Sequence, residues 1–150
     1  MQIVQRIDEV RAALDALRAR GTVGFVPTMG ALHEGHASLF RIARAECAVV
    51  AASAFVNPLQ FDDPADLAAY PQPDRGDAQL AEAEGVDVYF VPPVDEMYPA
   101  GHATRVEVAG PALGFEGAAR PGHFAGVATI CLKLFSIVRP DIVYLGQKDA

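Results

Sequence analysis

Residues 25–40 read FVPTMGALHEGHASLF, an apolar stretch followed by a glycine-containing turn and then by a helical pattern. The apolar part belongs to a predicted strand over residues 22–27. The helical spacing of Leu39 and Ile42 predicts a helix over residues 36–46. A strand that leads through a short turn into a helix is the repeating unit of α/β proteins, so this stretch predicts an α/β fold.

The rest of the chain continues the alternation of strands and helices. The unbroken apolar run of residues 47–56 is typical of a buried parallel strand. Strands are also predicted over residues 86–92 and 141–146, and residues 104–110 predict an edge strand or half of a hairpin. Further helices are predicted over residues 3–17, where Ile3, Ile7, Val10, Leu14 and Leu17 share one face, and over residues 74–84 and 124–138. Together these elements predict a mainly parallel sheet with flanking helices.

Composition and charge exclude several classes of protein. The chain has 150 residues, of which 51% are hydrophobic and 21% charged, as expected for one globular domain. Its net charge of −7 argues against a nucleic-acid-binding protein, which needs a basic face. No apolar run reaches transmembrane length and no signal peptide is evident, so we expect no membrane partner and a cytoplasmic location. Cys47 and Cys131 lie in apolar runs and are expected to be buried thiols.

His33 and His36 are the candidate functional residues of the opening stretch. Zinc proteases place two histidines four residues apart on a helix, whereas these are three apart with Gly35 between them, so no zinc site is predicted. A helix start offers free backbone N–H groups to an anion, and Gly30 and Gly35 would let the backbone approach a nucleotide. We therefore favour phosphate binding, and two surface or capping histidines remain the alternative.

Two further polar clusters follow predicted strands, and all three clusters are expected to meet at the carboxyl ends of a parallel sheet. Gln60 in NPLQF could bind a substrate hydroxyl or carboxylate, or only satisfy turn backbone. Lys148 could neutralise phosphate, and Asp149 could hold a ribose hydroxyl or a magnesium-bound water. The alternative for Lys148 and Asp149 is a solvated charge pair.

Five separated blocks of sequence resemble the pantothenate synthetase (pantoate–β-alanine ligase) family. They read VPTMGALHEGHASLFRIAR, VNPLQF, VPPVDEMYP, RPGHFAGVATICLKLFSIVRPD and GQKDA, and they cover nearly the whole chain in order. The resemblance implies a Rossmann-like fold of the HIGH nucleotidyltransferase superfamily. It also implies an AMP-forming ligase of pantothenate biosynthesis, which joins (R)-pantoate to β-alanine with ATP and Mg²⁺ through a pantoyl-adenylate.

The resemblance implies roles for individual residues. His36 matches the family's proton-donating histidine, and His33 and Lys148 are the other expected catalytic residues. Gln60 matches the glutamine that contacts pantoate and β-alanine, and no residue is assigned as a metal ligand. The expected ATP-binding residues are Met29, Gly30, Ala31, Leu32, His33, Glu34, Gly35, His36, Gly146, Gln147, Lys148 and Asp149.

The resemblance also implies a domain organisation. Residues 1–150 are expected to be the family's N-terminal ATP- and pantoate-binding domain, cut near its end, without the smaller C-terminal lid domain. A homodimer is expected for the full-length protein, and weak or no activity for this chain. Ala125 and Gln72 stand where many members have arginine. The alternatives are a non-catalytic nucleotide-binding fragment or another nucleotidyltransferase with an HxGH motif, from which Gln60 within NPLQF would distinguish this chain.

Overall fold

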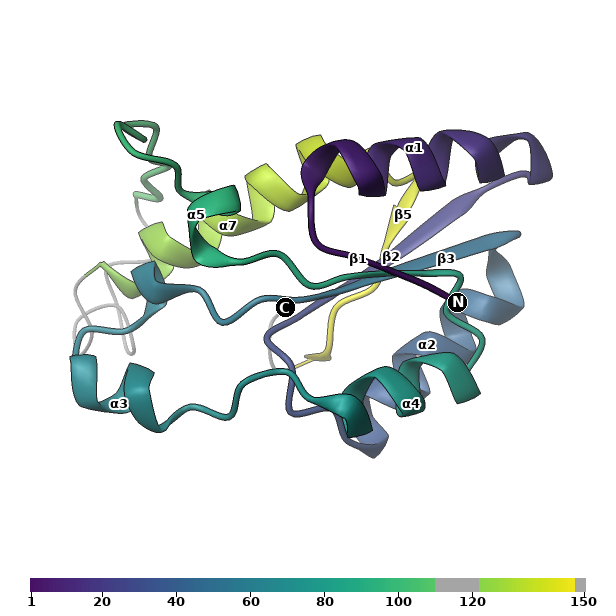
Figure 1. Ribbon diagram of the computed structural model, residues 1–150, viewed down its shortest axis with the longest axis horizontal. Coiled ribbons are helices and arrows are strands. Elements are labelled where there is room, and N and C mark those ends of the chain that lie inside the picture. The colour runs from purple at the N-terminus through teal and green to yellow at the C-terminus, as the bar shows by residue number, and fades with distance from the viewer. Residues whose placement is uncertain (110–121, 148–150) are drawn as a thin grey trace.

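A computed structural model of the chain describes residues 1–109 and 122–147 (Figure 1). Its centre is a five-stranded sheet in which every described strand pairing is parallel, with the strand order β1-β4-β3-β2-β5. The strands are β1 (Gln2–Val4), β2 (Val23–Thr28), β3 (Val49–Ala54), β4 (Val88–Phe90) and β5 (Ile142–Val143). The predicted parallel sheet is therefore confirmed.

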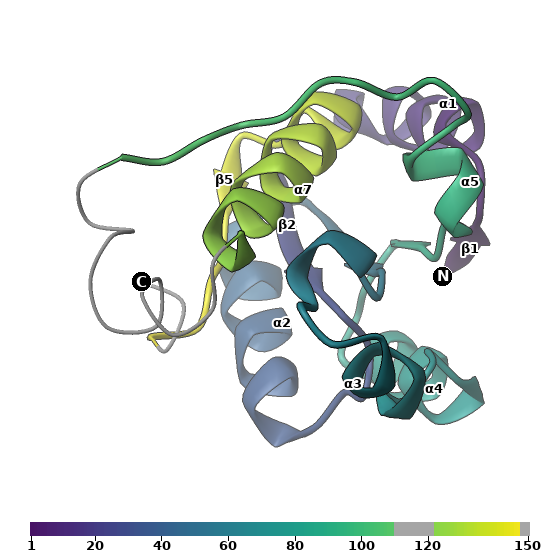
Figure 2. The ribbon, with the colours of Figure 1, turned by 90° about the vertical axis from the view of Figure 1, so that its left-hand side faces the viewer.

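Helices cover both faces of the sheet. Figures 1 and 2 show α1, α5 and α7 on one face and α2 and α4 on the other, while α3 lies beyond the carboxyl ends of the strands. Two 3-10 turns, η1 (Arg18–Arg20) and η2 (Pro58–Gln60), complete the described elements. The helices are α1 (Ile7–Leu17), α2 (Glu34–Glu46), α3 (Pro64–Ala69), α4 (Arg75–Ala83), α5 (Val94–Met97) and α7 (His123–Val138). None of these helices, all in the described ranges, is long and apolar enough to cross a membrane.

Alternate residues of β2 face two apolar cores, one on each side of the sheet. Phe25 packs in the core beneath α1 and α7, where its ring meets Phe135 edge-on at a centroid distance of 6.3 Å. Val26 faces the opposite core together with Phe40 of α2. Burying a side chain of this size stabilises the fold by about 1.5–3 kcal/mol. Burial on both faces explains the continuous apolar pattern of the central strands.

Two sequence predictions about elements are wrong. Ile3 belongs to β1, where it pairs with Tyr89, and is 57% exposed. Helix α1 begins only at Ile7, because the Glu9 side chain accepts the backbone N–H groups of Gln5 and Arg6. The helical spacing of Ile3 was thus a coincidence with the helix that follows.

The described part of the expected strand over residues 104–110 is not a strand. Residues 104–109 form no ladder, and Gly110 lies outside the described residues. The Val106 N–H donates instead to Thr129 Oγ1 of α7, at 3.0 Å. Alternation of side chains fits an extended segment laid on a helix as well as it fits a strand, so the pattern alone could not separate the two.

Candidate active site

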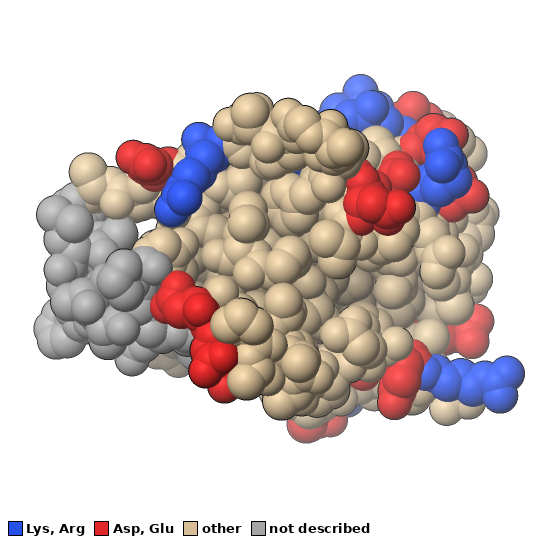
Figure 3. Space-filling model, turned by 60° about the vertical axis from the view of Figure 1, so that its left-hand side comes forward, with Lys and Arg blue, Asp and Glu red and all other residues tan. Residues whose placement is uncertain are grey.

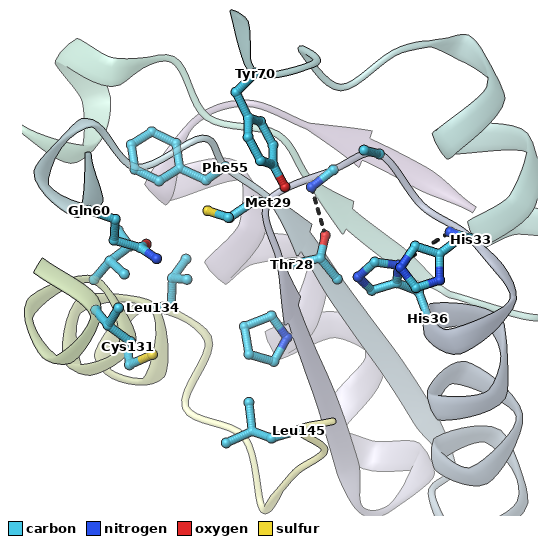
Figure 4. Close-up of a pocket in the computed structure, with 15 residues that line it drawn as sticks. Thr28, Met29, His33, His36, Phe55, Gln60, Tyr70, Cys131, Leu134 and Leu145 are labelled. Carbon is cyan, nitrogen blue, oxygen red and sulfur yellow. Dashed lines mark hydrogen bonds between the residues drawn. The ribbon is translucent and has the colours of Figure 1, made fainter. Parts of the chain in front are cut away.

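A pocket of about 360 Å³ opens at the carboxyl ends of the central strands (Figure 4). Strand β2 lies where the strand order turns, with β3 on one side and β5 on the other, which is the usual ligand site of open parallel sheets. The volume suits a small molecule or part of a nucleotide. The pocket is lined by Pro27, Thr28, Met29, Gly30, Ala31, His33, His36, Phe55, Gln60, Tyr70, Val127, Ile130, Cys131, Leu134 and Leu145.

The structure brings together the polar clusters that follow β2 and β3, as the sequence predicts. From the expected ATP-binding stretch, the lining includes Met29, Gly30, Ala31, His33 and His36. Leu32, Glu34 and Gly35 are not among the lining residues, and Glu34 points to Arg41 instead, with an ion pair at 2.7 Å.

No described residue of the third predicted cluster, GQKD, lines the pocket, but the residue before it does. Leu145, two residues after β5, lines the pocket, whereas Gly146 and Gln147 do not. Lys148 and Asp149 lie outside the described residues, so their expected contacts with ATP stay predictions.

The two histidines cap helix α2 and face each other. His33 is the N-cap residue, and its Nδ1 accepts the Gly35 N–H at 3.0 Å. His36 Nδ1 accepts the His33 N–H at 3.2 Å, and the ring centroids are 4.2 Å apart. A neutral imidazole whose Nδ1 accepts carries its proton on Nε2. In this tautomer each ring is an Nε2–H donor. Capping of α2 through Nδ1 is therefore compatible with phosphate binding through Nε2.

Three backbone N–H groups of the turn between β2 and α2 are bound within the protein. Thr28 Oγ1 accepts the Gly30 N–H at 3.1 Å. The Asp77 carboxylate accepts the N–H of Ala31 at 3.0 Å and that of Leu32 at 2.6 Å. These three N–H groups are therefore not the ones that would meet a ligand.

Gly30 in the turn and Gly35 in the first turn of α2 are needed for packing within the protein. Gly30 has a φ of 84°, and an added Cβ would lie 3.0 Å from the Pro73 side chain and 3.2 Å from Asp77 Oδ2. A Cβ on Gly35 would lie 2.8 Å from the His33 ring. The sequence analysis expected these glycines to let the backbone approach a nucleotide. Packing within the protein is sufficient to explain glycine at both positions.

A buried asparagine orients Gln60. Asn57, which is fully buried, accepts the Tyr98 hydroxyl at 2.8 Å and the Leu59 N–H at 3.3 Å through Oδ1. Its Nδ2 then donates to the Gly126 carbonyl at 3.1 Å and to Gln60 Oε1 at 2.9 Å. The Gln60 oxygen accepts this hydrogen bond, and an amide nitrogen is the kind of group that donates to a carboxylate or hydroxyl oxygen.

The wall opposite the histidines is apolar and comes from α7. Val127, Ile130, Cys131 and Leu134 line it together with Phe55. The sequence predicted α7 as a buried helix, but no signal separated its pocket-facing side from its core-facing side. Cys131 is half-buried at this wall, not buried as expected.

The pocket is not a charged cleft. None of its described lining residues is lysine, arginine, aspartate or glutamate. Figure 3 shows this side of the molecule with uncharged residues over the middle and charged residues toward the margins. Within residues 1–109 and 122–147, no cluster of three histidine, cysteine or acidic side chains could hold a metal ion.

The parallel sheet and the pocket at its strand ends define an α/β protein of the Rossmann-like class. The family model described as Pantoate-beta-alanine ligase matches residues 2–150. The chain belongs to the pantoate–β-alanine ligase family.

Individual relatives agree with this assignment. A pantothenate synthetase from Deinococcus radiodurans is 60% identical over 134 residues, covering 89% of this chain and 48% of the relative. The crystal structure of pantothenate synthetase from Thermus thermophilus superposes with a TM-score of 0.93 at 51% identity, over 99% of this chain and 53% of that one. A pantoate–β-alanine ligase from Francisella tularensis, complexed with beta-gamma ATP and β-alanine, superposes with a TM-score of 0.94 at 43% identity, over 99% and 57%. The chain thus spans about half the length of the relatives it matches.

Proposed function

We propose that this chain carries the ATP- and pantoate-binding site of an enzyme that ligates (R)-pantoate and β-alanine to pantothenate. The observation that carries the proposal is the shared pocket of His33, His36 and Gln60. Imidazole Nε2–H groups suit phosphate oxygens, while the Gln60 amide nitrogen suits the pantoate oxygens. The apolar wall from α7 suits the hydrocarbon part of pantoate.

The chemistry has two steps. A pantoate carboxylate oxygen attacks the α-phosphorus of ATP, and the bond to the bridging oxygen breaks, so that pyrophosphate leaves with the electron pair. The β-alanine amine then attacks the carbonyl carbon of the pantoyl-adenylate and loses a proton, and AMP leaves with the oxygen that came from pantoate. The first step needs in-line positioning and stabilisation of charge on the phosphates, the role proposed for His33 and His36.

Two further positive charges are proposed to act on the phosphates, Mg²⁺ and Lys148. Mg²⁺ is usually held by one or two carboxylates and by substrate phosphates, but no described residue lining the pocket is a carboxylate. The described residues therefore do not fit a metal site held by protein, and Mg²⁺ is expected to arrive bound to ATP. Lys148 is proposed to neutralise phosphate charge, in keeping with the family resemblance.

Domain organisation and assembly belong to the same proposal. Residues 1–150 would act as the nucleotide-binding domain of a homodimer whose lid domain is a separate part of the protein. Analytical ultracentrifugation of the intact protein tests the homodimer, and a monomer at micromolar concentration would reject it.

An isotope experiment on the intact protein tests the reaction. Pantoate labelled with ¹⁸O in its carboxylate should deliver one labelled oxygen to AMP for each pantothenate formed, because the attacking oxygen leaves with AMP. Label found only in pantothenate would reject the adenylate route. Formation of pyrophosphate with another acceptor, but not with pantoate, would favour a different nucleotidyltransferase.

Calorimetry on the 150-residue chain tests the binding half of the proposal. We expect weak binding of ATP with Mg²⁺, and binding of pantoate. No heat with either ligand would favour the alternative of an inert fragment.

A further inference from the structure

Asp77 is a buried acid with no part in the chemistry described above. It lies in the first turn of α4, is only 6% exposed, and forms none of the salt bridges among the described residues. Its carboxylate oxygens accept backbone N–H groups instead. Two of these belong to Ala31 and Leu32, at 3.0 and 2.6 Å, and a longer one at 3.4 Å comes from Asp74.

The turn that Asp77 holds has an unusual backbone. Gly30 and Ala31 are successive residues with φ values of 84° and 51°, and alanine rarely adopts such a conformation. Successive backbone N–H groups in a turn form a concavity that binds anions. In this protein the anion is supplied by the chain itself, so the turn is held by α4 from a position 46 residues away in sequence.

The turn leads directly into the histidine pair. Leu32 precedes His33, whose N–H donates to His36 Nδ1 and whose own Nδ1 accepts the Gly35 N–H. A displacement of the Leu32 backbone therefore displaces both rings together. Figure 4 shows the two rings side by side next to Thr28, so a shift would change where their Nε2–H groups meet a ligand.

We infer that Asp77 is a positioning residue, which fixes His33 and His36 in the pocket by binding the Ala31 and Leu32 N–H groups. The expected effect on the reaction rate rests on the proposed function. The expected effect on the positions of the two rings does not. A displacement of about 1 Å at reacting groups can cost about 10²-fold in rate.

The ligand-free protein gives the first test. In Asp77→Asn one oxygen of the carboxylate becomes an NH₂ group, so one of the two turn N–H groups loses its acceptor. Amide hydrogen exchange at Ala31 or Leu32 should accelerate at least about 10-fold, and the ring signals of His33 and His36 should shift in NMR spectra. Asp74→Asn is the matched control, because Asp74 caps the same helix and accepts no turn N–H. Unchanged exchange and ring signals in Asp77→Asn would overturn the inference.

Adenylate formation by the intact protein gives the second test. Asp77→Asn should lower the rate of pyrophosphate release at saturating substrates by about 10²-fold, whereas Asp74→Asn should stay within about twofold of the parent. A purely structural role would lower the melting temperature and leave the rate of the folded fraction unchanged, which would also overturn the inference. A parent protein that forms no adenylate would reject the proposed function, and the exchange test would still decide the role of Asp77.

Discussion

The two ring nitrogens of His33 and His36 are used differently. Nδ1 of each ring accepts a backbone N–H at the start of α2, and Nε2 is the nitrogen proposed to donate to a substrate. The capping bonds fix the tautomer before a ligand arrives, which lowers the cost of ordering the donors.

His36→Ala tests the catalytic side of this arrangement. We expect pantoyl-adenylate formation by the intact protein to fall by about 10²–10³-fold, because one donor to the phosphates is lost. The fold should persist, because the lost capping bond is worth only about 1 kcal/mol. Stopped-flow detection of pyrophosphate, with circular dichroism as the folding check, measures both. Ser38→Ala, on the same helix, is the control, and near-normal pyrophosphate release by His36→Ala would defeat the assignment.

Gln60→Ala separates the substrates. If Gln60 binds pantoate as proposed, the KM for pantoate should rise by about 10-fold or more, and the KM for ATP should change little. Initial-rate measurements with each substrate varied in turn give the two values. Equal increases for both substrates would argue against a role in pantoate binding.

Tyr89 and Tyr98 differ in how their hydroxyls are satisfied. The Tyr89 side chain is 1% exposed and its hydroxyl finds no hydrogen-bond partner within the described part of the chain, whereas the Tyr98 hydroxyl donates to Asn57 at 2.8 Å. We expect Tyr89→Phe to keep the free energy of unfolding or raise it by up to about 1 kcal/mol. Tyr98→Phe should lower it by about 1 kcal/mol and weaken pantoate binding. Urea denaturation of both variants checks this, and a loss of stability in Tyr89→Phe as large as in Tyr98→Phe would contradict it.

At the scale of elements, helix α7 and turn η2 determine the position of Gln60. Gly126 of α7 packs so closely on η2 that an added Cβ would overlap the Leu59 carbonyl and lie 3.0 Å from the Gln60 nitrogen. The Gly126 carbonyl also accepts a hydrogen bond from Asn57. Helix and turn are therefore one unit, although they are more than 60 residues apart in sequence.

Gly126→Ala should separate this unit. Overpacking against backbone costs about 1–3 kcal/mol, so we expect a loss of this size in the free energy of unfolding, together with weaker pantoate binding. Denaturant titration and calorimetry measure the two effects. Ser136→Ala, at an exposed position of the same helix, is the control. A variant with unchanged stability would show that the contact is looser than described.

Elements with a strong local period could be predicted from the sequence, and contacts between distant elements could not. Strands β2 and β3 and helices α2, α4 and α7 were expected because burial on one or both faces leaves a regular apolar pattern. β1 and α5 were missed, since elements of three and four residues are too short for a period.

The same limit holds for the candidate site. His33, His36 and Gln60 were found because polar residues after strand ends stand out in the sequence. Asp77 accepts the distant Ala31 and Leu32 N–H groups, and Asn57 is held by the distant Tyr98 and Gly126, and no local pattern encodes such contacts. The apolar residues of α7 that line the pocket cannot be told from core-facing residues by their sequence pattern.

For the whole molecule, buried tyrosines predict a loss of stability at alkaline pH. Burial and the nearby Asp77 and Asp74 charges raise the pKa of Tyr89, and burial and the charge of Cys131 raise the pKa of Tyr98 to about 12. Unfolded tyrosine has a pKa near 10, so the unfolded chain loses these protons first. The stabilisation is fully present below about pH 10 and is lost as the pH rises through the folded-state values.

Urea midpoints between pH 8 and about pH 12 test this expectation. The midpoint should fall above about pH 10, and the fall should be less steep in Tyr89→Phe than in the parent chain. Identical profiles for the two proteins would show that Tyr89 does not contribute. The slope of the denaturation curve should be compared as well, because a change in it would indicate a change in the unfolded state.

The position of Leu145 has an optical consequence. It lies at the rim of the pocket, 46% exposed, two residues after the edge strand β5. The sequence contains no tryptophan, so an indole introduced by Leu145→Trp would be the single strong fluorophore of the chain. Its emission would move toward the blue when a ligand displaces water from the rim, and occupancy could then be followed in real time without labelled substrate.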